Sequence, residues 1–325
     1  MEGKKTFDDL NLKDNLLRGI FSYGFENPSY IQGAGVPIIK SRKDLIAQAQ
    51  SGTGKTGTFS IGALENIDTE NKETQILILG HTHELVRQIS EVMRELGTYL
   101  NVSIMEVIGG TNLEECKRDL QKSPQIIIGT PGRVLDMIQK QYLFTEKIHT
   151  LIFDEADEIL SFGFKETIYN IVKCIPKECQ ICLFSATMPD EILELSNSFM
   201  NNPEKIIVEK EALTLEGIKQ FYIEVKFNDW KYDVLKDLYE TINISQCIIY
   251  INSKNKLMDV YRDLTNDNFP VSYIHGELNS HERKNTMADF KSGKTRILLS
   301  TDLLSRGIDI QQLSLVINFD LPKSK

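Results

Sequence analysis

Short runs of apolar and β-branched residues alternate along the chain with longer amphipathic segments. Near-continuous apolar runs such as Ile126–Ile128 and Leu151–Phe153 are typical of parallel strands that helices cover on both faces. Their alternation with helical segments predicts parallel α/β sheets. We expect strands at 44–47, 75–79, 103–108, 125–128, 150–153 and 180–184 in the first half, and at 220–225, 246–251, 271–274, 296–300 and 313–319 in the second.

The helical segments divide the chain into two similar units. Residues 84–96 and 165–175 have the apolar spacing of amphipathic helices. The charged, weakly periodic stretch 209–217 predicts a linker, with a first domain at 1–208 and a second at 218–325. Compared with the alternation of strands and helices in the first unit, the second unit lacks its last helix and strand. We therefore expect it to be incomplete at its C-terminal end.

Composition is that of an ordinary globular protein. The chain has 325 residues, of which 41% are apolar and 26% charged, and this length fits about two domains. No run approaches the roughly 20 apolar residues of a membrane span, and no apolar segment follows the first lysines as in a secretory signal. Five cysteines, an odd number, are typical of a reducing compartment. We therefore expect a cytoplasmic or nuclear protein without membrane contact.

Charge and cysteine spacing restrict the partners further. The net charge of −9 argues against constitutive nucleic-acid binding and confines any such binding to a local surface. Cys174, Cys179 and Cys182 lie close together but lack a nearby fourth ligand, so no structural metal is expected. Cys182 belongs to an apolar run and is predicted to be buried.

The segment Ala49-Gln-Ser-Gly-Thr-Gly-Lys-Thr56 follows an apolar run and precedes a helical one. This is the spacing of a phosphate-binding P-loop, with alanine in place of the first glycine. Gly52 and Gly54 allow successive N–H groups to face phosphates, and the following helix adds its positive end. Lys55 is predicted to neutralise the β and γ oxygens, and Thr56 to offer its hydroxyl to Mg²⁺. The alternative interpretation is a glycine-rich turn without a ligand.

Asp154 and Glu155 end the apolar run that starts at Leu151. A carboxylate at the carboxyl end of a parallel strand lies beside the crevice where a P-loop ligand binds. Asp154 is predicted to hold Mg²⁺ through its water shell, and Glu155 to orient or deprotonate the attacking water. Alone, such a pair is also typical of a helix N-cap, but together with the P-loop it indicates nucleotide hydrolysis.

The sequence Asp154-Glu-Ala-Asp157 resembles the motif that names the DEAD-box RNA helicases, and the chain is similar to their translation initiation factor four-A subgroup from about Thr6 to Pro322. The resemblance implies two RecA-like domains of the P-loop NTPase class. Further blocks occur in family order: Phe7 and Gly24–Gln32, Gly109-Gly110, Thr130–Arg133, Ser185-Ala186-Thr187, His275-Gly276 with Arg283, Thr301-Asp302 and Arg306–Asp309.

The resemblance assigns roles to these residues. The catalytic set is Lys55, Asp154, Glu155, Asp157, Ser185 and Thr187. ATP contacts are expected from Phe25, Gln32, Ala49, Gln50, Ser51, Gly52, Thr53, Gly54, Lys55, Thr56 and Asp309, and Mg²⁺ contacts from Thr56 and Asp154. RNA contacts are expected from Thr82, Gly110, Thr130, Arg133, Arg283 and Thr301.

The implied activity is an RNA-stimulated ATP hydrolase that unwinds short RNA duplexes. Gln32 would read the adenine edge with its donor and its acceptor, and Phe25 would stack on the ring; alternatively, Phe25 is a core residue and Gln32 a surface amide. RNA would be held by its backbone, without sequence specificity, and ATP would close the two domains. Translation-initiation or messenger-RNA-processing proteins are the expected partners.

The chain departs from the family pattern at several positions. The family block Pro-Thr-Arg-Glu-Leu-Ala reads His81-Thr-His83-Glu-Leu-Val, and a neutral His83 would weaken a phosphate contact. Gly33 replaces glutamine and weakens the expected helix by about 1 kcal/mol. Phe162 replaces arginine and Ser280 replaces glutamine.

The family continues after Leu321-Pro322 into a block whose arginines reach the γ-phosphate, and this block is absent from the sequence. Either the sequence is a truncated piece of a longer product, or the chain is a natural short form, for which weak turnover is predicted. The alternative function is therefore an ATP-gated RNA-binding or partner-sequestering protein with little hydrolysis. A DNA helicase or another P-loop NTPase is the third hypothesis.

Overall fold

The computed structural model describes residues 6–50, 52–161, 163–207, 219–242, 244–301, 310 and 313–322. The chain forms two compact units, Met1–Ile218 and Lys219–Lys325. The predicted linker 209–217 lies outside the described residues. None of the described helices is long and apolar enough to cross a bilayer.

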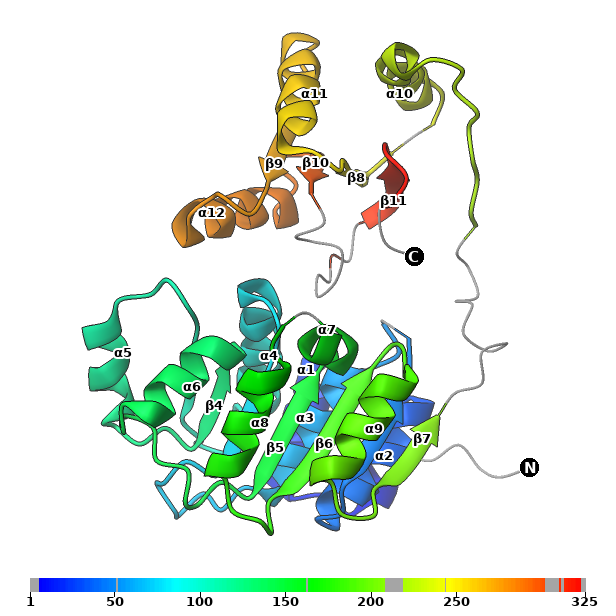
Figure 1. Ribbon diagram of the computed structural model, residues 1–325. Helices are drawn as coiled ribbons and strands as arrows, with labels where there is room; N and C mark the ends of the chain where they lie inside the picture. Colours follow the sequence, from blue (N-terminus) through cyan, green and yellow to red (C-terminus); the bar gives the residue numbers. More distant parts are fainter. Residues whose placement is uncertain are drawn as a thin grey trace. The chain divides into compact units, whose positions relative to one another are not determined.

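The first unit contains a parallel seven-stranded sheet with the order β3-β4-β2-β5-β6-β1-β7 (Figure 1). Its strands are β1 (Leu45–Gln48), β2 (Ile76–Leu79), β3 (Ile104–Val107), β4 (Ile126–Gly129), β5 (Thr150–Asp154), β6 (Gln180–Ser185) and β7 (Glu204–Ile207). Five of these strands are buried along their whole length, because both faces of the sheet are covered.

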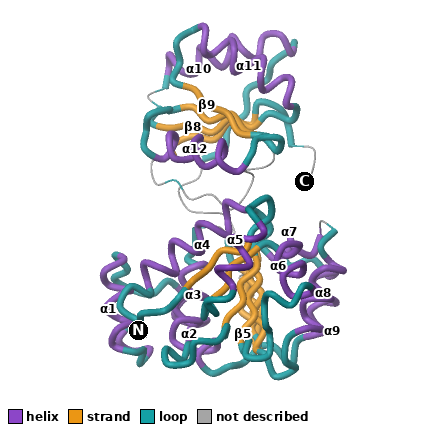
Figure 2. The backbone as a smooth tube through the Cα atoms, turned by 90° about the vertical axis from the view of Figure 1, so that its left-hand side faces the viewer, coloured by secondary structure: helices purple, strands orange, loops and turns teal. Residues whose placement is uncertain are grey.

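Helices cover the two faces of this sheet as separate sets (Figure 2). One face carries α1 (Asp14–Tyr23), α2 (Tyr30–Lys40), α3 (Lys55–Asn66) and α4 (His83–Leu96), and the other carries α6 (Pro131–Gln139), α7 (Ala156–Ser161), α8 (Lys165–Cys174) and α9 (Asp190–Phe199), with α5 (Leu113–Leu120) beside β3. Each face has its own apolar core. Cys182 is fully buried in the first, as predicted, and Cys179 is buried in the second, whereas Cys174 is exposed.

Helix α2 forms despite Gly33, Gly35 and Pro37 within it. A capping box stabilises its start, because the Ser29 N–H donates to Gln32 Oε1 at 2.8 Å and the Gln32 N–H donates to Ser29 Oγ. Gly35 has a packing reason, since a Cβ there would lie 2.7 Å from Thr58 Cγ2 of α3. Close packing against α3 thus offsets the low helix propensity of this segment.

The second unit contains a parallel four-stranded sheet with the order β11-β8-β10-β9. Its elements are α10 (Lys231–Thr241), β8 (Gln246–Tyr250), α11 (Lys254–Asn266), β9 (Val271–Ile274), α12 (Ser280–Lys291), β10 (Ile297–Ser300) and β11 (Leu313–Asn318). Helices α10 and α11 pack on one face, and Phe290 of α12 packs on the other with Ile248, Ile274 and Leu298. Two parallel α/β units were predicted, and this fold class is confirmed.

The predicted strand at 220–225 is wrong. These residues are irregular, and Phe221 and Tyr222 are 86% and 92% exposed. Among the described residues, the strands of the second unit pair only with one another, and an isolated strand without a partner is not stable in water. The pattern analysis also missed β7, an edge strand whose single buried residue is Ile206.

Candidate active site

The predicted residues of the first unit gather at one edge of its sheet. The P-loop follows β1, Thr82 follows β2, Gly109-Gly110 follows β3, Thr130 follows β4, and the acidic motif and Ser185-Ala-Thr187 lie at the ends of β5 and β6. All of these strands are parallel, so their carboxyl ends lie on the same side. This edge is where open α/β sheets bind ligands.

The P-loop has the backbone that its glycines predict. Gly52 and Gly54 have φ values of 80° and 97°. Residues other than glycine adopt this backbone region only at an energetic cost. Gly54 is the N-cap residue of α3. Lys55 is buried, and its ammonium donates to the Ala49 carbonyl at 2.6 Å across the loop. The Thr53 hydroxyl donates to the Gln50 carbonyl at 2.6 Å, while Ser51 lies outside the described residues.

Asp154 lies beside the P-loop and is 3% exposed. Burial raises its pKa to about 6, while the nearby Lys55 charge and hydrogen bonds from the Glu155 N–H and the Thr56 hydroxyl oppose that rise. A carboxylate and a hydroxyl together are the oxygen ligands that Mg²⁺ prefers. A divalent cation would also favour the ionised carboxylate that burial disfavours. The residues present therefore fit this ion.

Asp157 connects the acidic motif to the end of β6. Its carboxylate Oδ2 accepts a hydrogen bond from the Thr187 hydroxyl at 2.6 Å. The hydroxyl oxygen of Ser185 accepts from the backbone N–H of Asp157 at 3.3 Å and from that of Thr187 at 3.4 Å. Asp157 and Ser185 are buried, so this network fixes the two motifs relative to each other.

Gln32 and Phe25 lie against the P-loop helix. Gln32 is 3% exposed, and a Cβ on Gly57 would lie 2.7 Å from its Nε2 and 3.1 Å from Phe25 Cε2. Phe25 also stacks on the buried Phe7 at 6.2 Å between ring centroids. Gln32 is thus a buried amide beside the P-loop, not a surface residue. Its Oε1 already accepts from Ser29, which leaves one lone pair for a ligand.

The predicted RNA-binding residues of the first unit form a row along the same edge. The Thr82 hydroxyl caps α4 by accepting from the Leu85 N–H at 3.2 Å. Gly110 has a φ of 73°, and Arg133 Nη2 donates to the Thr111 carbonyl at 3.2 Å in the adjacent loop. Thr130 is the N-cap residue of α6 without a side-chain capping bond.

The second unit holds Arg283 and Thr301, which the sequence also assigned to RNA. Arg283 of α12 donates to the Gly276 carbonyl at 2.5 Å, and Thr301 follows β10 with its N–H on the Ile274 carbonyl at 3.4 Å. Asp302, Arg306–Asp309 and Phe162 lie outside the described residues, as does the side chain of Ser280. The predicted nucleotide contact of Asp309 therefore stays a prediction.

Comparison with known proteins identifies the family. Residues 29–195 match the family DEAD/DEAH box helicase, and residues 230–325 match the helicase conserved C-terminal domain. The ATP-dependent RNA helicase eIF4A of Scheffersomyces stipitis is 52% identical over 319 residues, which cover 98% of this chain and 80% of that protein. The eukaryotic initiation factor 4A of Caenorhabditis elegans is 48% identical over 321 residues, which cover 99% and 80%. The chain belongs to the DEAD-box RNA helicases, in the eIF4A subgroup.

A solved structure supports the same assignment. Dbp5 of S. cerevisiae, bound to RNA and ADP BeF3, is 34% identical and matches this helicase with a TM-score of 0.91, covering 98% of this chain and 81% of that one. The likeness extends over both units, so the RecA-like fold is confirmed for each.

One contact of this helicase was missed by the sequence analysis. His81 Nδ1 lies 3.2 Å from Glu155 Oε2, and the two side chains are 16% and 10% exposed. The sequence analysis named His81 only as part of a block that departs from the family pattern and gave it no role. The signal that could have revealed this contact is the position of the two residues. His81 and Glu155 each come two residues after the end of a predicted strand, 75–79 and 150–153, in the same predicted sheet.

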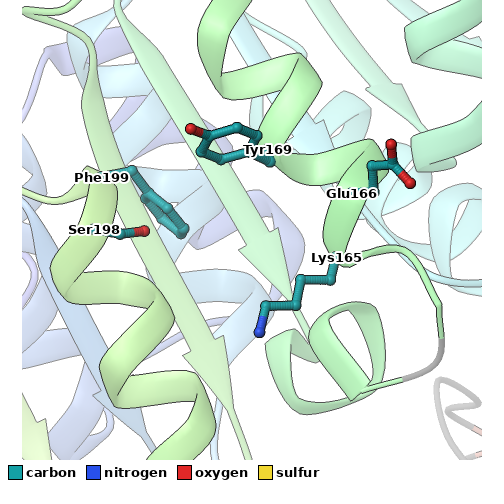
Figure 3. A pocket seen from close by; sticks show the side chains of 5 residues that line it. All are labelled: Lys165, Glu166, Tyr169, Ser198 and Phe199. Carbon is teal, nitrogen blue, oxygen red and sulfur yellow. The ribbon is translucent and has the colours of Figure 1, made fainter.

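Away from this edge, α8 and α9 enclose a largely apolar groove (Figure 3). Lys165, Glu166 and Tyr169 line it from α8, and Ser198 and Phe199 from α9. Phe199 also contacts Phe153 of β5, with 6.2 Å between ring centroids. The groove contains none of the predicted site residues.

Proposed function

We propose that the chain is an ATP-dependent RNA helicase that holds the RNA backbone without sequence specificity and unwinds short duplexes when ATP closes its two units. The observation that carries this proposal is the cluster of Lys55, Thr56 and Asp154 at the sheet edge, with Glu155 joined to it by the hydrogen bond from its N–H to Asp154. Two hydrogen bonds of Asp157, one accepted by its carboxylate from the Thr187 hydroxyl and one donated by its N–H to the Ser185 hydroxyl, link the acidic motif to the end of β6.

Each side chain has a role that its position supports. Lys55 neutralises the β and γ oxygens, and the backbone N–H groups from Gly52 to Lys55 receive the phosphates. Thr56 and Asp154 are the residues that would hold Mg²⁺, and the bound ion would neutralise charge on the phosphates. Glu155 orients or deprotonates the attacking water.

The base and RNA contacts extend the same proposal. Gln32 bonds the adenine edge through Nε2 and the remaining lone pair of Oε1, and Phe25 stacks on the ring. Thr82, Gly110, Thr130 and Arg133 of the first unit, with Arg283 and Thr301 of the second, contact the sugar–phosphate backbone. Contacts of this kind position an RNA strand without reading its sequence. Because they come from a few residues, a chain with a net negative charge can bind RNA through a local surface.

The identity to eIF4A proteins supports messenger RNA before ribosome loading as the substrate, with translation-initiation proteins as partners in the cytoplasm. Messenger-RNA-processing proteins, in the nucleus, are the alternative partners, because fold and motifs are shared between these processes.

Phosphate release with and without single-stranded RNA tests the enzyme, and displacement of a short labelled RNA strand tests unwinding. We expect stimulation by RNA rather than DNA, and loss of hydrolysis in Lys55→Ala and Glu155→Gln. A folded preparation that binds ATP without RNA-stimulated release would refute the hydrolase.

The alternative, an ATP-gated RNA-binding protein with little turnover, predicts a different result in the same assay. RNA retention would then depend on ATP while phosphate release stays at its RNA-free rate. His83 supports it, since an imidazole in place of the forked guanidinium of arginine is a weaker phosphate ligand.

A further inference from the structure

His81 and Glu155 are brought together by strand register. In the parallel pair β2 and β5, Leu79 lies opposite Phe153. His81 comes two residues after Leu79, and Glu155 comes two residues after Phe153. Both side chains therefore lie at the same edge of the sheet. The resulting 3.2 Å contact joins His81 Nδ1 to Glu155 Oε2.

The backbone conformation at Glu155 is well defined. Glu155 has a φ of 53°, which is rare for a residue with a side chain, and its N–H donates to Asp154 Oδ1 at 3.0 Å. These features determine where the side chain starts. The carboxylate at the far end of this side chain is the group proposed to meet the attacking water, and the contact with His81 is made there.

His81 is suited to hold that carboxylate. Thr82, the next residue, caps α4, so the backbone that carries the imidazole is anchored at a helix start. The imidazole has two side-chain torsions, and both a ring protonated at Nδ1 and an imidazolium can donate from Nδ1. The family block has proline at this position, which offers no such group. The contact is therefore a feature of this chain.

We propose that His81 is a positioning residue that holds the Glu155 carboxylate in the orientation from which it acts on the attacking water. The inference rests on the proposed hydrolysis of ATP. It adds a residue of this chain to the machinery at the end of β5, and it predicts an effect on turnover rather than on ATP binding.

Steady-state kinetics of RNA-stimulated phosphate release test the role. His81→Ala is expected to lower kcat about 10- to 100-fold, since misplacing a reacting group by about 1 Å costs up to that much. KM for ATP stays within about twofold, because His81 is expected to act through Glu155 and not on nucleotide binding. His81→Asn, whose Nδ2 can replace the imidazole Nδ1 donor, is expected to return kcat to within about threefold of the wild-type value.

A matched substitution far from this edge is the control. His149 precedes β5 at the other end of the same strand, and His149→Asn is expected to leave kcat and KM unchanged. An unchanged kcat in His81→Ala would overturn the proposal. An Asn variant as slow as the Ala variant, or a raised KM at normal kcat, would overturn it equally.

A readout independent of hydrolysis separates this inference from the function on which it rests. In protein labelled with ¹⁵N-histidine, the ring signals of His81, assigned from their loss in His81→Asn, are expected to shift in Glu155→Gln. The ring signals of His149 are expected to stay in place. If the His81 signals do not move, the contact is absent and the proposal fails, whatever the hydrolysis assay gives. If they move while the wild-type protein hydrolyses no ATP, the contact stands and the proposed function fails.

Discussion

Gly57 determines whether Gln32 and Phe25 can lie against the P-loop helix, and Gly57→Ala tests this directly. The new Cβ would lie 2.7 Å from Gln32 Nε2 and 3.1 Å from Phe25 Cε2. Ordinary contacts are about 3.5–4.0 Å, so the amide must move by roughly 0.8 Å or more. It cannot do so freely, because it is buried and Oε1 is bound to the Ser29 N–H at 2.8 Å.

The expected cost falls on both ATP binding and folding. Overpacking costs about 1–3 kcal/mol, and alanine in place of glycine inside α3 returns about 0.5–1 kcal/mol, so the free energy of unfolding falls by about 0–2.5 kcal/mol. A displaced Gln32 loses adenine hydrogen bonds worth about 0.5–1.5 kcal/mol each. We therefore expect the Kd for ATP to rise about tenfold, while binding of GTP, which Gln32 does not read, changes little.

Competition of ATP and GTP against a fluorescent ADP analogue measures both affinities, and thermal unfolding measures stability. Gly33→Ala is the matched control, because a Cβ at Gly33 has no atom within 4 Å outside the chain positions next to it and its own helix backbone. It should stabilise α2 by about 0.5–1 kcal/mol with ATP affinity unchanged. In a Gln32→Ala background, the effect of Gly57→Ala on ATP affinity should largely disappear. Equal ATP affinities of Gly57→Ala and wild type, with an unchanged ratio to GTP, would refute the reasoning.

Two further predictions concern stability. Asp44 is 8% exposed, and its carboxylate accepts hydrogen bonds from the N–H groups of Ile181 at 2.7 Å and Asn201 at 2.6 Å. Asp44→Ala should therefore lower the free energy of unfolding, measured in urea, by about 2–4 kcal/mol with ATP affinity retained. A loss below about 1 kcal/mol would contradict this prediction. Burial, helped by the Arg42 charge, lowers the pKa of His149 from 6.5 to about 4, so the folded state holds the neutral ring and loses stability as the pH falls from 6.5 towards 4. The pKa difference limits the loss of stability to about 3 kcal/mol, and partial exposure of the ring reduces the expected loss to about 1–2 kcal/mol. The free energy of unfolding of wild type relative to His149→Asn should therefore change with pH over this range. A difference that stays constant with pH would contradict the prediction.

The sequence was informative where burial and chemistry are local. Strands such as Ile126–Gly129 are apolar along their whole length, so their pattern is visible without the rest of the fold. The P-loop was visible for the same reason, since its glycines, lysine and threonine are consecutive. Local pattern failed where a partner decides the outcome. Residues 220–225 have the composition of a strand but no paired neighbour in the described sheet, whereas Glu204–Ile207 has little apolar pattern and pairs with β1 all the same.

The same distinction explains why His81 was dismissed and Glu155 was not. A carboxylate after a buried strand, downstream of a P-loop, has a chemical meaning that its neighbours in the chain supply. A histidine on a loop has none until its partner is known, and that partner lies 74 positions further along the chain. Parallel register supplies the connection, because residues at equal distances beyond Leu79 and Phe153 emerge side by side. A departure from a family pattern is therefore most informative when the residue that lies beside it on the paired strand is also known. Seen in this way, the replacement of proline by His81 adds a polar group at the one place where it meets the carboxylate proposed to activate water.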